Sequence, residues 1–139
     1  MSQKILVVED DKKIATALAI RLRTAGYEVL IAPDAVLAMS MALKHRPSLL
    51  LLDILIPGGN GFQVAEWLQS LDAMVSIPYI FITASKTPGL RERARSLGAA
   101  GFFEKPYDAG ELLATIREAL EPADGYWAIR ESTVRTWNI

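Results

Sequence analysis

The chain alternates between short continuous apolar runs and longer segments in which apolar residues recur every three or four positions. The first run, residues 5–8, is rich in β-branched residues and is followed by acidic residues, as is typical of a strand buried on both faces. In the next segment the spacing places Ile14, Leu18 and Leu22 on one face of a helix. Gly26 then provides a C-terminal cap. The pattern predicts a strand followed by an amphipathic helix.

The same alternation is repeated four more times. Strands are predicted at residues 29–31, 49–52, 77–82 and 101–104, and a helical segment follows each of them. In the second helix the spacing places Val36, Met39 and Leu43 on one face. Predicted helix N-terminal caps are Asp11, Asp34 and Asp108. Because five strand–helix units alternate, we expect an α/β fold: a parallel sheet with helices on both faces.

The periodic pattern ends near residue 121, which divides the chain into a domain, residues 1–121, and a C-terminal tail, residues 122–139. The apolar residues of the tail fit two alternatives. Trp127, Val134 and Trp137 could share a helix face, whereas the residues at 127, 129, 137 and 139 fit the alternation of a strand. The conformation of the tail is therefore left open, as is the choice between packing on the domain and forming a dimer or partner surface.

The composition narrows the possible functions. Hydrophobic residues make up 51% and charged residues 22% of 139 residues, which suits one packed domain. A net charge of -1 does not favour binding to nucleic acid or to an anionic membrane. The absence of cysteine and the single His45 exclude disulfides, thiolate zinc sites and cysteine nucleophiles. The N-terminus lacks an apolar stretch long enough for a signal peptide or membrane span, so we expect a cytoplasmic protein.

Charged and hydroxyl side chains follow four of the predicted strands. Glu9 and Asp10 come after the first strand, Asp53 after the third, Thr83 ends the fourth, and Lys105 follows the fifth. In an open parallel sheet these positions meet at one edge, where ligands bind. Carboxylates about 5 Å apart would repel each other by roughly 3 kcal/mol per pair at an effective dielectric constant of about 20. We therefore expect a bound cation.

Magnesium is the cation that this set of residues favours. Carboxylate oxygens are its usual protein ligands, and it completes its coordination shell with water and phosphate oxygens. A phosphoryl group is therefore a natural further ligand. Asp53 is the predicted nucleophile, since a carboxylate beside a metal, an ammonium and a hydroxyl can accept a phosphoryl group as an acyl phosphate.

These residues also lie in motifs that resemble those of two-component response-regulator receiver domains, the CheY-like family. The motifs are residues 5–11 (ILVVEDD), 53–61 (DILIPGGNG), 83–84 (TA) and 105–106 (KP). Each motif alone is weak, but four in order at successive strand ends form a specific pattern. The resemblance implies a flavodoxin-like, five-stranded parallel sheet in the order 2-1-3-4-5.

The resemblance also assigns roles at the site. It implies that a histidine kinase or phosphotransfer protein phosphorylates Asp53. Magnesium would be bound by Asp10, Asp53 and the backbone carbonyl of Leu55, with Glu9 acting through water. Lys105 would pair with the phosphoryl oxygens.

The resemblance further implies a conformational switch. Thr83 would form a hydrogen bond with the phosphoryl group, and Phe102 would occupy the position of the switch aromatic residue. The peptide bond between Lys105 and Pro106 is expected to be cis. A downstream protein would then bind the face formed by the fourth helix, fifth strand and fifth helix. Such a domain catalyses only its own phosphorylation and dephosphorylation, so it is not expected to be an enzyme in the usual sense.

Two alternatives from other functional classes remain open. A degenerate receiver could act as a binding module that needs no phosphorylation, and a metal-dependent phosphatase could use an Asp nucleophile. The phosphatase would need a second acid near the nucleophile, whereas Leu55 is apolar. Residues 122–139 are too few for a helix-turn-helix domain, so no direct DNA binding is expected in this chain. A homodimer is possible.

Overall fold

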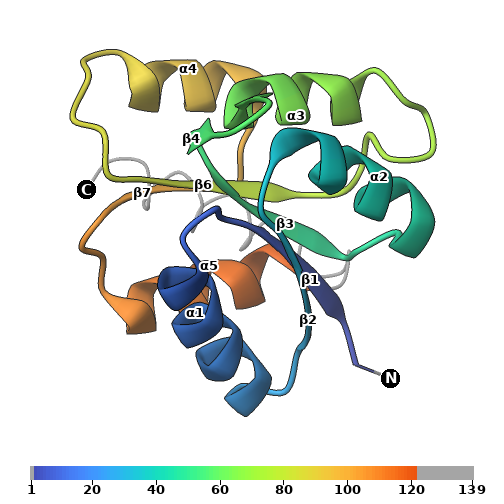
Figure 1. Cartoon of the computed structure of the whole chain (residues 1–139), viewed down its shortest axis with the longest axis vertical. Helices are drawn as coiled ribbons and strands as arrows, with labels where there is room; N and C mark the ends of the chain where they lie inside the picture. Colours follow the sequence, from blue (N-terminus) through green and yellow to red (C-terminus); the bar gives the residue numbers. More distant parts are fainter. Residues whose placement is uncertain (1, 122–139) are drawn as a thin grey trace.

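A five-stranded parallel sheet forms the centre of the computed structural model, which describes residues 2–121 (Figure 1). Its strands are β1 (Lys4–Val8), β2 (Glu28–Ala32), β3 (Leu49–Asp53), β6 (Tyr79–Thr83) and β7 (Gly101–Glu104). They lie in the order β2-β1-β3-β6-β7, and every neighbouring pair is parallel. Since β6 and β7 are the fourth and fifth strands of this sheet, the predicted order is confirmed.

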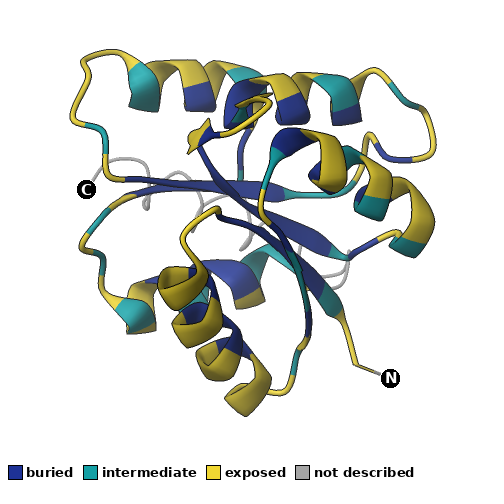
Figure 2. Ribbon diagram, viewed as in Figure 1, coloured by how far each residue is buried: buried dark blue, intermediate teal, exposed yellow. Residues whose placement is uncertain are grey.

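Five helices cover the two faces of the sheet. They are α1 (Lys12–Thr24), α2 (Ala35–His45), α3 (Gly61–Gln69), α4 (Leu90–Leu97) and α5 (Ala109–Ala119). Helices α1 and α5 lie on one face, and α2, α3 and α4 lie on the other (Figure 1). Each side has its own apolar core (Figure 2). The strands β1, β3, β6 and β7 are mostly buried between these cores, whereas the edge strand β2 is partly exposed. Burial on both faces explains why β3 consists of four leucines before Asp53.

The predicted helix caps are confirmed. Asp11 accepts hydrogen bonds from two backbone N–H groups of α1, Asp34 accepts one from Leu37, and Asp108 accepts one from Glu111. These bonds satisfy amide groups that have no partner within the helix. The cis peptide bond between Lys105 and Pro106 is also confirmed.

The structure corrects the predicted core positions of two helices. In α1, Leu18 and Leu22 are buried, but Ile14 is exposed. In α2, the predicted apolar face carrying Val36, Met39 and Leu43 is not the buried one. The buried residues of this helix are small: Ala35, Ala38 and Ala42. Alanine faces the sheet because its small side chain lets the helix backbone pack closely against the strands, which leaves the larger side chains outside.

A second difference concerns the segment after β3. Residues 57–61 were predicted to be a loop, but β4 (Leu55–Ile56) and β5 (Gly59–Asn60) form a short antiparallel hairpin there. Asn60 then caps α3 in a reciprocal arrangement with Gln63, in which each side chain accepts a hydrogen bond from the other's backbone N–H. The tail, residues 122–139, lies outside the described residues. Within residues 2–121, no helix is long and apolar enough to cross a membrane.

A polar contact joins β6 to the end of α4. The hydroxyl of Tyr79 donates a hydrogen bond to the Leu97 carbonyl at 2.6 Å, and the Gln69 side chain donates to both of these oxygens. Tyr79 is 4% exposed, and its burial raises the pKa of the phenol to about 12, with the Gln69 hydrogen bond opposing the shift. The tyrosine thereby links α3, β6 and α4.

Tyr79→Phe is expected to lower the free energy of unfolding by about 1 kcal/mol, because it removes the partly buried hydrogen bond from the Tyr79 hydroxyl to the Leu97 carbonyl. The difference should depend on pH. The pKa of Tyr79 is higher in the folded state than in the unfolded chain, so its contribution is complete below about pH 10 and is lost as the pH rises towards 12. Urea unfolding of both proteins across this range should show the steeper loss for the unmodified chain. Parallel curves would contradict the assignment.

Candidate functional site

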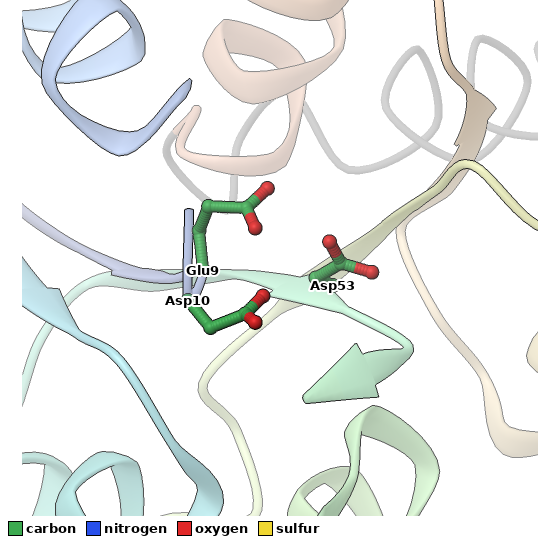
Figure 3. A group of neighbouring side chains, drawn as sticks. All are labelled: Glu9, Asp10 and Asp53. Carbon is green, nitrogen blue, oxygen red and sulfur yellow. The ribbon is translucent and has the colours of Figure 1, made fainter. Parts of the chain in front are cut away.

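Three carboxylates meet at the carboxyl edge of the sheet. Glu9 and Asp10 follow β1, and Asp53 is the last residue of its neighbour β3. One oxygen from each residue lies within 4.8 Å of the others (Figure 3). Glu9 and Asp53 are buried, whereas Asp10 is exposed. The predicted convergence of these residues is confirmed.

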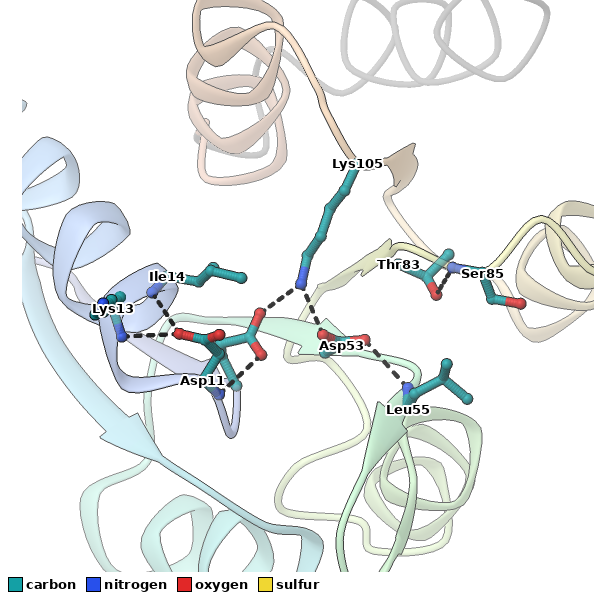
Figure 4. A network of polar contacts seen from close by, with 9 residues as sticks. Asp11, Lys13, Ile14, Asp53, Leu55, Thr83, Ser85 and Lys105 are labelled. Atoms are coloured by element: carbon teal, nitrogen blue, oxygen red, sulfur yellow. Dashed lines mark hydrogen bonds and ion pairs between the residues drawn. The ribbon is translucent and has the colours of Figure 1, made fainter.

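Lys105 neutralises part of this negative charge. Its ammonium group lies 2.6 Å from Oε1 of Glu9 and 2.9 Å from Oδ2 of Asp53 (Figure 4). The lysine reaches the site from the end of β7, at the far side of the sheet from β1. Its side chain is only 19% exposed, so these ion pairs are more shielded from water than surface pairs. Lys105 therefore holds two strand ends together.

The electrostatics of this group favour a charged lysine. Burial alone would lower the pKa of Lys105, but hydrogen bonds to Glu9 and Asp53, together with their charges, outweigh burial and raise it. Burial raises the pKa of Glu9, and the nearby charge of Asp53 acts in the same direction. Hydrogen bonds from Lys105 and from the Asp11 N–H partly offset this rise. The lysine thus stabilises the Glu9 carboxylate, which would otherwise take up a proton more readily.

The backbone after β3 fixes the Asp53 side chain. The N–H of Leu55 donates a hydrogen bond to Oδ1 of Asp53 at 3.1 Å, which leaves Oδ2 facing Lys105. The N–H of Gly61 donates to the Ile54 carbonyl at 3.0 Å and closes the hairpin against the strand. A Cβ atom on residue 61 would lie only 2.6 Å from the Asp53 carbonyl oxygen. Glycine is therefore required for this approach of α3 to the acidic residue.

Thr83 and Lys105 belong to adjacent strand ends. Thr83 is fully buried, and its carbonyl accepts a hydrogen bond from the Lys105 N–H at 2.8 Å. Its hydroxyl accepts a hydrogen bond from the Ser85 N–H at 3.1 Å (Figure 4). The threonine is thus placed at the same edge as Asp53, on the neighbouring strand.

Phe102 lies further from the acidic group, on β7. Its ring is buried, and the guanidinium of Arg91 on α4 lies 4.9 Å from the ring centre. The ring lines a groove of about 310 Å³ between α4, β7 and α5, and several acidic residues contribute to the same groove. The predicted switch residue therefore lies between the site edge and a surface groove.

The donor set defines which ion the site can hold. Glu9, Asp10 and Asp53 offer hard oxygen atoms, and no sulfur or imidazole ligand lies in the group. Such oxygens suit Mg²⁺ or another hard divalent cation. The exposed Asp10 leaves an approach from solvent to the cluster. The residues therefore fit a small, partly hydrated cation.

Some features of the site were missed at the sequence level. The support of Asp53 by the Leu55 N–H depends on backbone direction, which the order of residues does not reveal. The reciprocal cap of α3 could have been found, because Asn60 followed three residues later by Gln63 is its usual pattern. The 2.8 Å ion pair beside the site joins Lys86, in the loop after β6, to Glu104 at the end of β7, and no local sequence pattern indicates it.

Comparisons with known proteins agree with this geometry. The family model of the response regulator receiver domain matches residues 5–117. The chain is 31% identical over 123 residues to the polar-differentiation response regulator DivK of Brucella anthropi, a match that covers 88% of this chain and 100% of DivK. It is also 31% identical over 121 residues to the DNA-binding dual master transcriptional regulator RpaA of Synechocystis sp., covering 87% of this chain and 50% of RpaA.

The chain therefore spans the whole of one of these relatives and half the length of the other. The fold is also similar to the crystal structure of a CheY-like response regulator receiver domain protein from Methanospirillum hungatei. That comparison gives a TM-score of 0.80 at 28% identity and covers 86% of this chain and 94% of the other.

Gly61→Ala is expected to lower the free energy of unfolding by about 1–3 kcal/mol, because the new methyl group must displace the backbone of Asp53. Gly110→Ala is the matched control. At that position in α5 the nearest atom to a new Cβ is a side-chain oxygen of Asp108 at 3.1 Å, so the backbone need not move. Urea unfolding should separate the two variants, and equal stabilities would show that the close approach at Gly61 is not constraining.

Proposed function

Because the chain belongs to the response regulator receiver family, we propose that it is a phosphorylated switch of two-component signal transduction with Asp53 as the phosphoacceptor. One observation carries the proposal. Asp53 stands at the end of the central strand β3 with one oxygen near an ammonium group and two further carboxylates beside it. A carboxylate held in this way is fixed in direction and remains reachable from the side of Asp10.

Asp10 and Asp53 would hold Mg²⁺ directly, together with the Leu55 carbonyl, and Glu9 would act through a water molecule. The close carboxylate oxygens and the all-oxygen donor set support this assignment. When bound, the ion supplies positive charge against the oxygens of a phosphoryl group.

The acceptor step is a phosphoryl transfer. An oxygen of Asp53 forms a bond to phosphorus while the bond from phosphorus to the imidazole nitrogen of a phosphohistidine donor breaks, which leaves that nitrogen with the electron pair. The ammonium of Lys105, now 2.9 Å from Oδ2 of Asp53, is close enough to pair with the phosphoryl oxygens. The hydrogen bond from the Leu55 N–H keeps the carboxylate in one orientation during the approach. The donor would be a histidine kinase or a phosphotransfer protein in the cytoplasm.

Phosphorylation then changes the balance of contacts at the strand ends. It adds close to two negative charges beside Lys105 and draws the Thr83 hydroxyl towards the phosphoryl group, away from the Ser85 N–H. Thr83 pairs in the sheet with Glu104, two residues beyond Phe102. The face of α4, β7 and α5 around Phe102 would therefore change its affinity for a downstream protein. The chain turns over no substrate beyond its own phosphoryl group.

Asp53→Asn is expected to abolish acid-labile incorporation of phosphate from radiolabelled acetyl phosphate in the presence of Mg²⁺, because the amide is not a nucleophile. EDTA should abolish labelling of the unmodified chain. Asp72→Asn, which changes an exposed aspartate elsewhere, should label normally. Continued labelling of Asp53→Asn would move the acceptor to another residue, and an unmodified chain that never labels would instead be a binding module. Steady release of phosphate from a phosphomonoester would indicate a phosphatase.

The phosphorylated chain is expected to lose its label slowly, with a lifetime longer than minutes. Leu55 stands two residues beyond Asp53 with its side chain 61% exposed, and an apolar group cannot orient a hydrolytic water. Leu55→Asn should shorten the lifetime severalfold. Val75→Asn, at another exposed apolar residue, should leave it unchanged. A rapid loss of label from the unmodified phosphoprotein would refute the role of Leu55.

A further inference from the structure

Helix α2 exposes an unusually apolar outer face. Val36, Leu37 and Leu43 are 63%, 44% and 50% exposed, and Ser40 is exposed between them. The helix has no charged residue from Ala35 to Leu43, so its outer side lacks the polar surface that a solvent-facing helix normally carries. Figure 2 shows this outer side of α2 as exposed. Leaving these side chains in water is unfavourable, which suggests that another surface covers them.

The spacing of the exposed residues resembles a helix-packing seam. Val36 and Leu43 are seven residues apart, and Met39, half-buried, lies between them at the third position. An apolar pattern of this kind forms a narrow stripe along one side of a helix, the geometry with which two helices pack together. The side of α2 that faces the sheet is formed by its buried alanines and the partly buried Met41. The outer stripe of Val36, Met39 and Leu43 therefore lies on a different side of α2 from the one that packs on the sheet.

The ends of the helix carry opposite charges. Asp34 caps the N-terminus, and Lys44, His45 and Arg46 lie at the C-terminus. If two copies of α2 pack antiparallel, the acidic end of each helix faces the basic end of the other. The two helix dipoles then point in opposite directions, which is the favourable arrangement. Ser40 lies midway along the helix, so its small side chain would fall at the two-fold axis, where the helices approach most closely.

We infer that a second copy of this chain covers the outer face of α2, in a symmetric dimer with the two α2 helices antiparallel. The inference does not depend on the phosphorylation of Asp53. A single pair of helices buries less than the roughly 1,600 Å² of a standard stable interface. The dimer is therefore weak and dependent on concentration.

Sedimentation velocity of the full chain, over concentrations up to about 1 mM, tests the dimer. We expect a monomer–dimer equilibrium that Leu43→Lys weakens at least about tenfold, because it buries an unpaired ammonium in the seam. Ile20→Lys on α1, which changes a residue of similar exposure, should leave the equilibrium unchanged. Lys44→Glu should weaken it about threefold, since antiparallel packing brings residue 44 near Asp34 of the second copy. Circular dichroism melting checks that each variant remains folded.

The absence of cysteine from the chain permits a second measurement. Ser40→Cys is expected to form a disulfide-linked dimer under mild oxidation, because the two residues meet at the axis. Ser96→Cys, at an exposed position of α4, is the matched control and should stay largely monomeric.

Several results would overturn the inference. A chain that is monomeric at every concentration, or a dimer that Leu43→Lys leaves intact, excludes the α2 seam. Equal crosslinking of Ser40→Cys and Ser96→Cys excludes the two-fold axis at residue 40. A monomer that instead co-sediments with vesicles of anionic phospholipid through α2 would identify a membrane-binding face.

Discussion

The ion pairs of Lys105 are the interaction on which the site depends. A parallel sheet brings the carboxyl ends of its strands to one edge, and this chain places carboxylates at two neighbouring ends. Glu9 and Asp53 are both buried, and the burial of Glu9 together with the nearby charge of Asp53 raises the pKa of Glu9. The Lys105 ammonium lies within 3 Å of both carboxylates and supplies a positive charge between them, while Asp10 remains open to solvent. The same lysine thus offsets the repulsion between two buried carboxylates within an acidic cluster that could hold a metal ion.

The rest of the fold holds these charges in position. Strand β3 is buried on both faces, so Asp53 is anchored by four leucines that pack into two cores. The Leu55 N–H fixes one oxygen of Asp53, and Gly61 allows the start of α3 to lie against the same backbone. Because the supporting contacts come from backbone groups as well as side chains, the orientation of the carboxylate is set by the path of the chain after β3.

The alternation of strands and helices predicted the parallel sheet and the meeting of Glu9, Asp10 and Asp53 at one edge, and the resemblance to receiver domains implied the strand order. Neither predicted which side of every helix is buried. Strand ends could be identified because apolar runs stop abruptly at residues such as Asp53. The site then followed from topology, since parallel strands share an edge. In α2, by contrast, the large apolar residues suggested the wrong face. Periodicity reports that a side is apolar, whereas steric fit decides which apolar side meets the sheet, and here the close packing selects alanine.

Hydrogen bonds from backbone N–H groups connect α2 to the edge of the sheet that carries Asp53. The N–H of Ala35, the first residue of α2, donates a hydrogen bond to the Pro57 carbonyl in the turn between β4 and β5. The same hairpin begins at Leu55, whose N–H contacts Asp53. Two hydrogen bonds, one at Leu55 and one at Pro57 of this hairpin, therefore connect the Asp53 carboxylate to the first residue of α2. The side of α2 that meets the sheet carries Ala35, Ala38 and Ala42, with the partly buried Met41 also packed against the core.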